Sequence, residues 1–325
     1  MEKSVALIGG GGFIGTNLAN FFIEKGYNVL IIGRSLDEGT ETDNGKTYKA
    51  NIDVNNTLKL VDALNGYDNV IWLVSDLVPS ASMDRLVDDF NFNVSPLINF
   101  LGSIDKLNDL KRFVFMSSGG TIYGDSPNHI LLNEDFHKNP ISAYGLSKII
   151  SENYINFISK RSSFESIILR PSNVYGNHQN LKKPQGIVGY AFNALLNNKS
   201  IDLYDEGMVV RDFIHVLDLA EAVKCCIENQ HEGGRVETYN VGSQEGYTIR
   251  TILDLISEIS SKNIKTISKP ARSFDCAYNV LDITKINTEF GWEPKIKLKE
   301  GLEQVWICAK SELQNDKTNY APENI

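Results

Sequence analysis

The chain has 325 residues, of which 42% are hydrophobic, 22% charged and 10% aromatic. This composition is typical of globular proteins and excludes collagen-like, disordered and disulfide-scaffold proteins. The formal net charge of −9 argues against non-specific binding to nucleic acid or to an anionic membrane, because such binding requires a cationic surface.

Neither a metal site nor an export signal is indicated by the sequence. The four cysteines have no CxxC spacing and no zinc-ligand arrangement with the five histidines, so we expect inert core thiols. The N-terminus lacks the apolar stretch and cleavage site of a secretory signal, and no apolar run approaches the ~20 residues of a membrane helix. We therefore expect a cytoplasmic protein that binds neither membrane nor nucleic acid.

Apolar runs and amphipathic stretches alternate over about the first 170 residues. The runs predict strands at Val5–Ile8, Val29–Ile32, Val70–Val74, Phe113–Met116 and Ile167–Leu169. The stretches predict helices at Thr16–Lys25, Leu58–Asn65, Phe92–Ile104 and Tyr144–Lys160. This alternation predicts an α/β fold with a doubly wound parallel sheet of the Rossmann type, which forms a dinucleotide-binding domain at residues 1–171.

Shorter, mixed elements follow in the second half of the chain. We expect a helix at Ile187–Asn197, and a return of about residues 212–242 to the first sheet through strands at Asp212–Val216 and Thr238–Val241. The segment from Ile249 to Trp306 predicts helix, strand and helix. A smaller substrate domain at residues 172–313 should face the C-terminal ends of the strands, where open α/β sheets bind ligands, and residues 314–325 should form a frayed tail.

A glycine cluster directly follows the first predicted strand. Residues 9–15 have the sequence GGGGFIG, which fits both G-x-G-x-x-G and G-x-x-G-x-x-G. Without Cβ atoms the backbone can approach a pyrophosphate, whose charge is met by unpaired N–H groups at the helix N-terminus. The alternative is a tight strand-to-helix turn. Because strands and helices continue to alternate, we favour dinucleotide binding by Gly9, Gly12, Phe13, Ile14 and Gly15.

The end of the second predicted strand bears on the choice of cofactor. An NAD site usually has a carboxylate there that bonds the ribose 2′-hydroxyl, whereas this chain has Gly33 and Arg34. The Arg34 guanidinium can bond a 2′-phosphate, which favours NADP, or it can be an exposed arginine at a strand end. Asp53 follows the third predicted strand and is a candidate contact to the adenine; alternatively, it caps the helix near Asn56.

Tyr144 and Lys148 lie four residues apart, on one face of a predicted helix. The pKa of a free tyrosine is near ~10, and lowering it to ~7 requires about 4 kcal/mol in favour of the phenolate. An ammonium group at ~4 Å supplies about that much at an effective dielectric constant of ~20. The pair can therefore form a general base that takes a proton from a sugar hydroxyl while a hydride leaves its carbon. The alternative is an accidental pair on a surface helix.

With both motifs in place, the chain resembles the extended short-chain dehydrogenase/reductase family, in particular its nucleotide-sugar 4-epimerases. The likeness covers nearly the whole chain through the ordered segments GGGGFIG, SSGGTIYG, AYGLSK, LRPSNVYG, VRDFIHVLDLA, YNVG and FGWEP. It implies an N-terminal domain that binds NAD or NADP, a C-terminal nucleotide-sugar domain and a homodimer. It also implies that Tyr144 is the base and that Lys148 positions the cofactor ribose and favours the phenolate.

The resemblance implies further contacts residue by residue. Additional cofactor contacts fall at Val54, Leu73, Val74, Ser75, Asn93, Ser117 and Pro171. Contacts to the nucleotide diphosphate and the sugar fall at Asn173, Gln185, Arg211, Arg272, Asp275 and Asn279. Arginine forks suit diphosphate oxygens. The structural alternatives are a local ion pair of Arg211 with Asp212, and a turn supported by Asn173.

Several positions depart from the family pattern. Gly119 occupies the usual hydroxyl position, so Thr121 or Ser118 must supply the hydrogen bond to the sugar oxygen, and we favour Thr121. Sugar dehydratases of this family carry an Asp–Glu pair where this chain has Gly120 and Thr121, so we do not expect elimination. Gly33 removes the carboxylate that an NAD site usually carries.

We therefore expect epimerisation at C4 of a UDP-hexose by transient oxidation to a 4-keto sugar, with NAD retained. UDP-Glc and UDP-Gal are the expected substrates, and UDP-GlcNAc and UDP-GalNAc are included if Asn279 admits an N-acetyl group; alternatively, Asn279 only ends a strand. Two other functions stay open. One is an NADPH-dependent nucleotide-sugar 4-ketoreductase, prompted by Arg34, and the other is a non-catalytic cofactor-sensing protein, prompted by Gly119.

Overall fold

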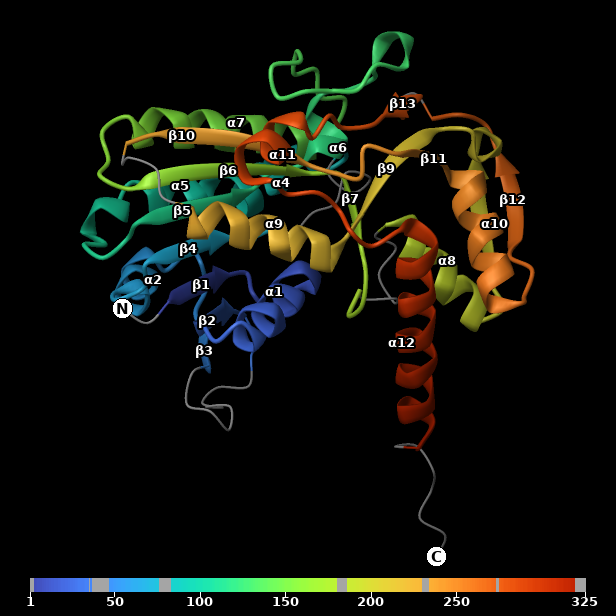
Figure 1. Cartoon of the computed structure of the whole chain (residues 1–325), viewed down its shortest axis with the longest axis horizontal. Helices are drawn as coiled ribbons and strands as arrows, with labels where there is room; N and C mark the ends of the chain where they lie inside the picture. Colours follow the sequence, from blue (N-terminus) through green and yellow to red (C-terminus); the bar gives the residue numbers. More distant parts are fainter. Residues whose placement is uncertain are drawn as a thin grey trace, which may run out of the picture.

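The structure is a computed structural model that describes residues 3–34, 36, 47–75, 83–179, 186–229, 234–272 and 275–318. Its largest sheet has seven parallel strands in the order β10-β6-β5-β4-β1-β2-β3 (Figure 1). These strands are β1 (Ser4–Ile8), β2 (Asn28–Gly33), β3 (Thr47–Asn51), β4 (Asn69–Trp72), β5 (Arg112–Met116), β6 (Glu165–Pro171) and β10 (Val236–Val241). The predicted doubly wound α/β fold is confirmed, and its strand order reverses between β1 and β4, where such sheets bind ligands.

Helices cover both faces of this sheet. One face carries α1 (Phe13–Glu24), α9 (Val216–Glu228) and α11 (Thr284–Phe290), and the other carries α2 (Thr57–Leu64), α5 (Ser95–Leu101) and α7 (Ala143–Ser159). Along β1, Val5 and Leu7 join the first core cluster, whereas Ala6 and Ile8 join the second. β1, β4, β5 and β6 are buried throughout, and the apolar runs predicted from the sequence form their central parts, whereas the ends of β6 carry the buried polar residues Glu165 and Arg170.

The C-terminal part is built on two smaller sheets. A four-stranded sheet joins β7 (Asn173–Tyr175), β9 (Val210–His215), β11 (Gly246–Thr248) and β13 (Tyr278–Asn279), and β8 (Ser200–Tyr204) pairs with β12 (Lys265–Lys269). A separate apolar cluster holds together α8 (Ile187–Leu196), α10 (Ile249–Ser260) and α12 (Leu298–Thr318). In Figure 1 this part lies beside the large sheet, and β13 and β9 bridge the two.

Three expected elements differ from those observed. The prediction that Asp212–Val216 belongs to the large sheet is wrong, because β9 pairs with β7, β11 and β13. In this region β10 is the strand of the large sheet, and α9 packs against one of its faces. The single helix expected at Phe92–Ile104 is two helices, α4 (Leu86–Asn93) and α5, because Pro96 lies in the first turn of α5 and favours a new helix start. The tail expected from residue 314 is wrong in its start, because α12 continues to Thr318.

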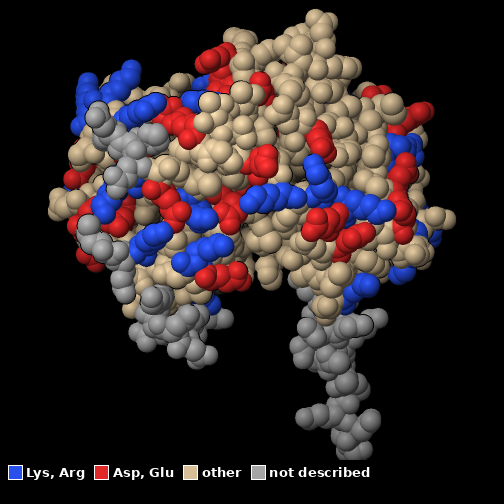
Figure 2. Space-filling model, in the orientation of Figure 1, with Lys and Arg blue, Asp and Glu red and all other residues tan. Residues whose placement is uncertain are grey.

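The shorter helices are α6 (Gly119–Ile122), η1 (Ile104–Lys106), η2 (Pro127–His129) and η3 (Asp205–Gly207). Within the described ranges, no helix combines the length and the apolar character that crossing a membrane requires. On the face that Figure 2 shows, Lys and Arg side chains lie among Asp and Glu side chains across the middle of the molecule.

Candidate active site

The glycine loop lies at the point where the strand order of the large sheet reverses. Gly9 has φ of +83°, and a Cβ there would lie 3.0 Å from the backbone nitrogen of Val74, at the end of β4. A Cβ on Gly15 would lie 2.5 Å from the Cα of Gly10. Close backbone packing therefore requires glycine at both positions, because a side chain would force the loop away from β4 and α1 away from the loop.

The start of α1 offers a cradle for a phosphate group. Gly12 is exposed and is the N-cap of α1, and no side chain caps this helix end. A Cβ on Gly12 would meet only the Gly9 carbonyl oxygen within 4 Å, at 3.6 Å, so space is left beside the loop. The uncapped N–H groups and this space fit the pyrophosphate of a dinucleotide. The helix begins at Phe13, three residues earlier than the Thr16 expected from the sequence.

The end of β2 forms the outer wall of this loop. Arg34 is exposed, and Leu36 lies over Gly11, where a Cβ would meet the Leu36 side chain at 2.9 Å. The Asn51 side chain holds the Leu36 backbone: its amide oxygen accepts from the Leu36 nitrogen and its amide nitrogen donates to the Leu36 carbonyl oxygen, both at 3.1 Å. Nearby, the Asp53 carboxylate accepts hydrogen bonds from the Asn55 backbone and side chain, while the Asn56 side chain caps α2. The contact of Asp53 with an adenine stays a prediction.

Tyr144 and Lys148 lie on the first two turns of α7. The Ser142 hydroxyl caps this helix by accepting a hydrogen bond from the Gly145 nitrogen, and a Cβ on Gly145 would lie 2.6 Å from the Thr121 carbonyl oxygen. The motif AYGLSK therefore packs α7 tightly on α6. The Lys148 ammonium donates to the Met116 carbonyl oxygen at 2.9 Å, at the end of β5, and lies 5.4 Å from the centre of the Tyr144 ring.

Burial and nearby charges set the pKa values of this pair. Burial raises the pKa of Tyr144 above its ordinary value, a hydrogen bond from the Ser75 side chain acts against this rise, and the charge of Asp89 adds to it. Burial lowers the pKa of Lys148 to about 8, while Asp89 and Glu152 oppose this fall. At neutral pH the lysine is therefore largely cationic, and the tyrosine needs further positive charge before it can ionise.

Three positions compete to supply a hydroxyl group to a substrate. The Thr121 hydroxyl oxygen is buried and has no hydrogen-bond partner among the residues described. Ser118 is the N-cap of α6 and is half-buried, and its side chain makes no capping hydrogen bond. Gly119 leaves no room for a side chain, because a Cβ would lie 2.6 Å from Leu281 and 2.9 Å from the Arg170 carbonyl oxygen. Thr121 is thus the buried hydroxyl that a ligand could satisfy.

A buried ion-pair network holds α7 against the sheet. The carboxylate of Glu152, four residues after Lys148, accepts hydrogen bonds from Arg170 at 2.8 and 3.0 Å, from Lys138 at 2.9 Å and from the Ser117 hydroxyl at 2.6 Å. Burial raises the pKa of Glu152, but Arg170 and Lys138 lower it more, so that the pKa lies below its ordinary value. The Ser117 hydroxyl hydrogen is used in this bond to Glu152. The expected contact of Ser117 with a cofactor would therefore have to involve other atoms of this residue.

Two of the expected diphosphate ligands lie close together in the C-terminal part. Arg272 makes a two-pronged pair with Asp275, with bonds of 2.8 and 2.9 Å, and its guanidinium lies 4.2 Å from the centre of the Tyr204 ring. Arg211 donates to the Cys276 carbonyl oxygen at 2.7 Å. Burial lowers the pKa of Arg211, the charge of Asp275 opposes this fall, and the charge of Arg272 adds to it. The alternative pair of Arg211 with Asp212 is not formed, since the Asp212 carboxylate accepts from Ser243 and Leu281 instead.

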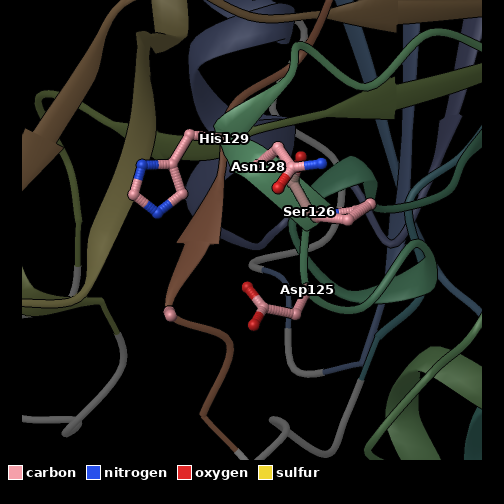
Figure 3. Close-up of a pocket in the computed structure, with 6 residues that line it drawn as sticks. Asp125, Ser126, Asn128 and His129 are labelled. Carbon is pink, nitrogen blue, oxygen red and sulfur yellow. The ribbon is translucent and has the colours of Figure 1, made fainter.

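An open pocket of about 560 Å³ lies at the surface of the C-terminal part. It is lined by the loop before η2, by η2 itself and by the residue before β13 (Figure 3): Asp125, Ser126, Pro127, Asn128, His129 and Ala277. The Asp125 carboxylate accepts from the Tyr278 nitrogen at 2.9 Å, and the His129 ring stacks on the Tyr278 ring at 4.6 Å. Ala277 follows Cys276, whose carbonyl oxygen accepts a hydrogen bond from Arg211, so this arginine contacts the residue next to the pocket lining.

The remaining expected substrate residues have mixed positions. Asn173 donates to the Asp212 carbonyl oxygen at 2.9 Å and lies beside Gly120. Asn279 is fully buried; its amide nitrogen lies 3.4 Å from the carbonyl oxygens of Gly119 and Gly124, and its oxygen has no partner among the described residues. A contact of Asn279 with a sugar substituent stays a prediction, and Gln185 lies outside the described residues.

Four expected cofactor residues lie at or after the ends of β3, β4 and β6: Val54, Leu73, Val74 and Pro171. Leu73 and Val74 border Gly9 directly, whereas Pro171 ends β6 and Val54 precedes α2. Asn93 is buried and donates to the Asp89 carboxylate at 2.9 Å, so this amide is engaged within the protein.

Sequence reasoning missed Asp89, which lies on α4 with 1% of its surface exposed. No local signal marks this residue, because the spacing of Leu86, Val87 and Phe90 in LVDDFNFN predicts that the apolar face of the helix is the buried one. A helix face with Asp89 and Asn93 is buried, whereas Leu86, Val87 and Phe90 are exposed. Such an inverted pattern indicates a buried polar group and, on the outer face, an apolar contact surface.

Comparisons with known proteins agree with this geometry. A model of the NAD dependent epimerase/dehydratase family matches residues 5–242. A putative UDP-glucose 4-epimerase from Methanocaldococcus jannaschii is 32% identical over 93% of this chain and 96% of its own length, and a dTDP-4-dehydro-6-deoxyglucose reductase from Escherichia coli is 28% identical over 94% and 96%. The structure of a UDP-glucose 4-epimerase from Thermotoga maritima with UDP-glucose is 27% identical, covers 95% of this chain and 99% of its own, and has a TM-score of 0.86.

Proposed function

The chain belongs to the NAD dependent epimerase/dehydratase family, and from that premise we propose that it epimerises C4 of a UDP-hexose through a transient 4-keto sugar. The resemblance to nucleotide-sugar epimerases is thereby confirmed at the level of the family. One observation carries the proposal: Tyr144 and Lys148 lie together at the sheet edge where β1 ends in the glycine loop.

The glycine loop and the end of β5 would hold the cofactor. The N–H groups at the start of α1 would meet its pyrophosphate, and Lys148 would donate to its ribose. When bound, a nicotinamide cofactor supplies the hydride acceptor and donor at C4. NAD is the cofactor we propose from the family, while Gly33 and Arg34 leave NADP as the alternative.

Tyr144 would handle the proton at the C4 oxygen of the sugar. The Lys148 ammonium favours the phenolate, so that Tyr144 takes the proton in the oxidative half and returns it in the reductive half. The unpaired Thr121 hydroxyl would donate a hydrogen bond to the same sugar oxygen. Both groups come from adjoining elements, because Gly145 brings α7 within van der Waals contact of Thr121.

The substrate must be held by its nucleotide while the hexose turns over, because the second hydride transfer uses the other face of C4. Arg211 and Arg272 are suited to the diphosphate, and Asn173 lies on the adjoining strand β7. We propose UDP-Glc and UDP-Gal as substrates. UDP-GlcNAc and UDP-GalNAc follow if the buried Asn279 can move to leave space for an N-acetyl group.

The rival activity is an NADPH-dependent 4-ketoreductase. Arg34 and the likeness to the dTDP-4-dehydro-6-deoxyglucose reductase favour it. The test incubates the purified chain with UDP-galactose and trace NAD, and follows UDP-glucose and reduced cofactor together. Conversion to UDP-glucose with no net cofactor turnover supports the epimerase. A second incubation supplies NADPH and a nucleotide 4-keto sugar. Stoichiometric NADPH consumption there, without conversion of UDP-galactose in the first incubation, overturns the epimerase in favour of the reductase. Failure of both reactions favours a cofactor sensor.

We also propose that the chain forms a homodimer through α4 and α7, which pack against each other. Their outer faces expose large apolar side chains: Leu86, Val87 and Phe90 on α4, and Leu146, Tyr154 and Phe157 on α7. On α7 these three exposed residues and the half-buried Ile150 follow helical spacing along one stripe. A second copy would cover this surface with the same surface, as a two-fold axis requires.

A further inference from the structure

Helix α4 places an acidic side chain inside the protein and apolar side chains outside. Asp89 is 1% exposed, whereas its neighbour Asp88 is only half-buried and pairs with Arg85 at the surface. A carboxylate is costly to bury unless hydrogen bonds and opposite charges compensate for the lost water. The contacts of Asp89 therefore indicate what the buried charge acts on.

Both oxygens of the Asp89 carboxylate are engaged. One accepts a hydrogen bond from the Ser147 hydroxyl, and the other accepts from the Asn93 amide at 2.9 Å. Ser147 precedes Lys148 on α7, so the carboxylate is fixed to the helix turn that carries the ammonium group. The contact joins α4 to α7 at the level of the reactive pair.

The charged and titratable groups around Asp89 are few. On α7 its charge acts on Tyr144 and Lys148, and Lys148 also senses Glu152. Helix α5, which also packs against α4, has the sequence SPLINFL and carries no titratable side chain. On α4 itself, Asp88 and Arg85 neutralise each other at the surface. Among the described residues of α4, α5 and α7, Tyr144 and Lys148 are thus the groups whose pKa the charge of Asp89 changes.

We propose that Asp89 is a positioning residue for the Tyr144–Lys148 pair: it fixes the Lys148 turn of α7 through Ser147 and places a buried negative charge at that turn. The inference rests on the proposed function in so far as it concerns turnover. Burial lowers the pKa of Lys148, and the charge of Asp89 opposes this fall. Burial raises the pKa of Tyr144, and the charge of Asp89 adds to this rise.

The test replaces Asp89 by Asn, which keeps the shape and removes the charge. Asp88→Asn is the matched control, since it removes the same charge one residue away at the surface. The protein is labelled with tyrosine carrying ¹³C at Cζ and loaded with NAD, and the Tyr144 signal is assigned from the Tyr144→Phe spectrum. Its titration midpoint is measured alongside the pH profile of kcat/KM for UDP-galactose.

Loss of the negative charge lowers the pKa of both members of the pair. Asp89→Asn should therefore move the Tyr144 midpoint to lower pH by about one unit, and both limbs of the pH profile should move in the same direction. Asp88→Asn should leave both measurements within error of the parent. A folded Asp89→Asn protein with an unchanged midpoint overturns the proposal, and so does an equal shift in the control.

The two readouts separate this inference from the proposed function. The NMR titration needs no turnover, so a shifted midpoint in a chain that converts no UDP-galactose upholds the role of Asp89 and rejects the epimerase. If the parent enzyme is active but the Tyr144 titration midpoint is the same in Asp89→Asn, the epimerase is upheld and the role of Asp89 is rejected. If Asp89→Asn does not fold, Asp89→Ser removes the same charge from a smaller side chain, and the same shift is required of it.

Discussion

The phenol of Tyr144 is hydrogen-bonded to the side chain of Ser75, in the segment that follows β4. Burial raises the pKa of Tyr144, and a hydroxyl donor acts against this rise because it stabilises the phenolate. Gly119 cannot carry a hydroxyl, since its position is filled by Leu281 and the Arg170 carbonyl group. Ser75 thus approaches the phenol from the β4 side of the sheet edge, and Thr121 belongs to the neighbouring α6.

Replacing Ser75 by Ala should move the acidic limb of the kcat/KM profile to higher pH, by about half a unit to one unit. Without the donor, Tyr144 holds its proton more tightly, and less phenolate is present at a given pH. The measurement is the rate of UDP-galactose conversion across the pH range. An acidic limb that stays in place or moves to lower pH would show that this bond does not stabilise the base.

Replacing Thr121 by Ala should lower kcat by about 10²-fold, the cost of removing one donor to a reacting oxygen. The acidic limb should stay in place, which distinguishes Thr121 from Ser75. The free energy of unfolding should hardly change, because the Thr121 hydroxyl has no partner among the described residues to lose. Undiminished kcat would transfer the role to Ser118.

Replacing Gly119 by Ser should destabilise the protein by about 1–3 kcal/mol rather than improve catalysis, because the new Cβ would overlap Leu281. Gly120→Ser is the control, since a Cβ there would meet only the Asn173 amide, at 3.7 Å. Urea denaturation compares the two variants. Equal stability of both would mean that the packing at Gly119 yields without cost.

Replacing Val87 by Glu should produce monomers. Val87 is 72% exposed on α4, at the proposed two-fold surface, and a buried carboxylate there would meet its own copy or apolar side chains. Leu58→Glu is the control, because Leu58 is 76% exposed on α2, away from that surface. Light scattering coupled to gel filtration gives the mass of each variant. A monomeric parent chain, or a dimeric Val87→Glu protein, would refute the proposed interface.

Much of the fold followed from the sequence because its signals are local. Buried parallel strands are continuous apolar runs, and the glycine loop has the spacing that close backbone packing at Gly9 and Gly15 demands. The spacing of Tyr144 and Lys148 also places them on one helix face by helix geometry alone. In contrast, β9 was assigned to the wrong sheet, because an apolar run does not indicate which neighbour it pairs with.

The parts of the site that were missed depend on contacts between distant segments. Asp89 meets Ser147 across 58 positions of the chain, and no local pattern links them. Ser75 was expected to touch a cofactor, but its bond to Tyr144 depends on how α7 packs against the end of β4. The tight fit of Leu281 on Gly119 likewise joins the C-terminal part to α6.

We propose Tyr144 as the acid–base group of a 4-epimerisation. The most direct measurement is the conversion of UDP-galactose to UDP-glucose by the parent chain and by Tyr144→Phe, with bound NAD quantified in both. The Tyr144→Phe variant should retain its cofactor and lose about 10³-fold or more in kcat. A Tyr144→Phe protein that interconverts the two sugars at the parental rate would contradict it.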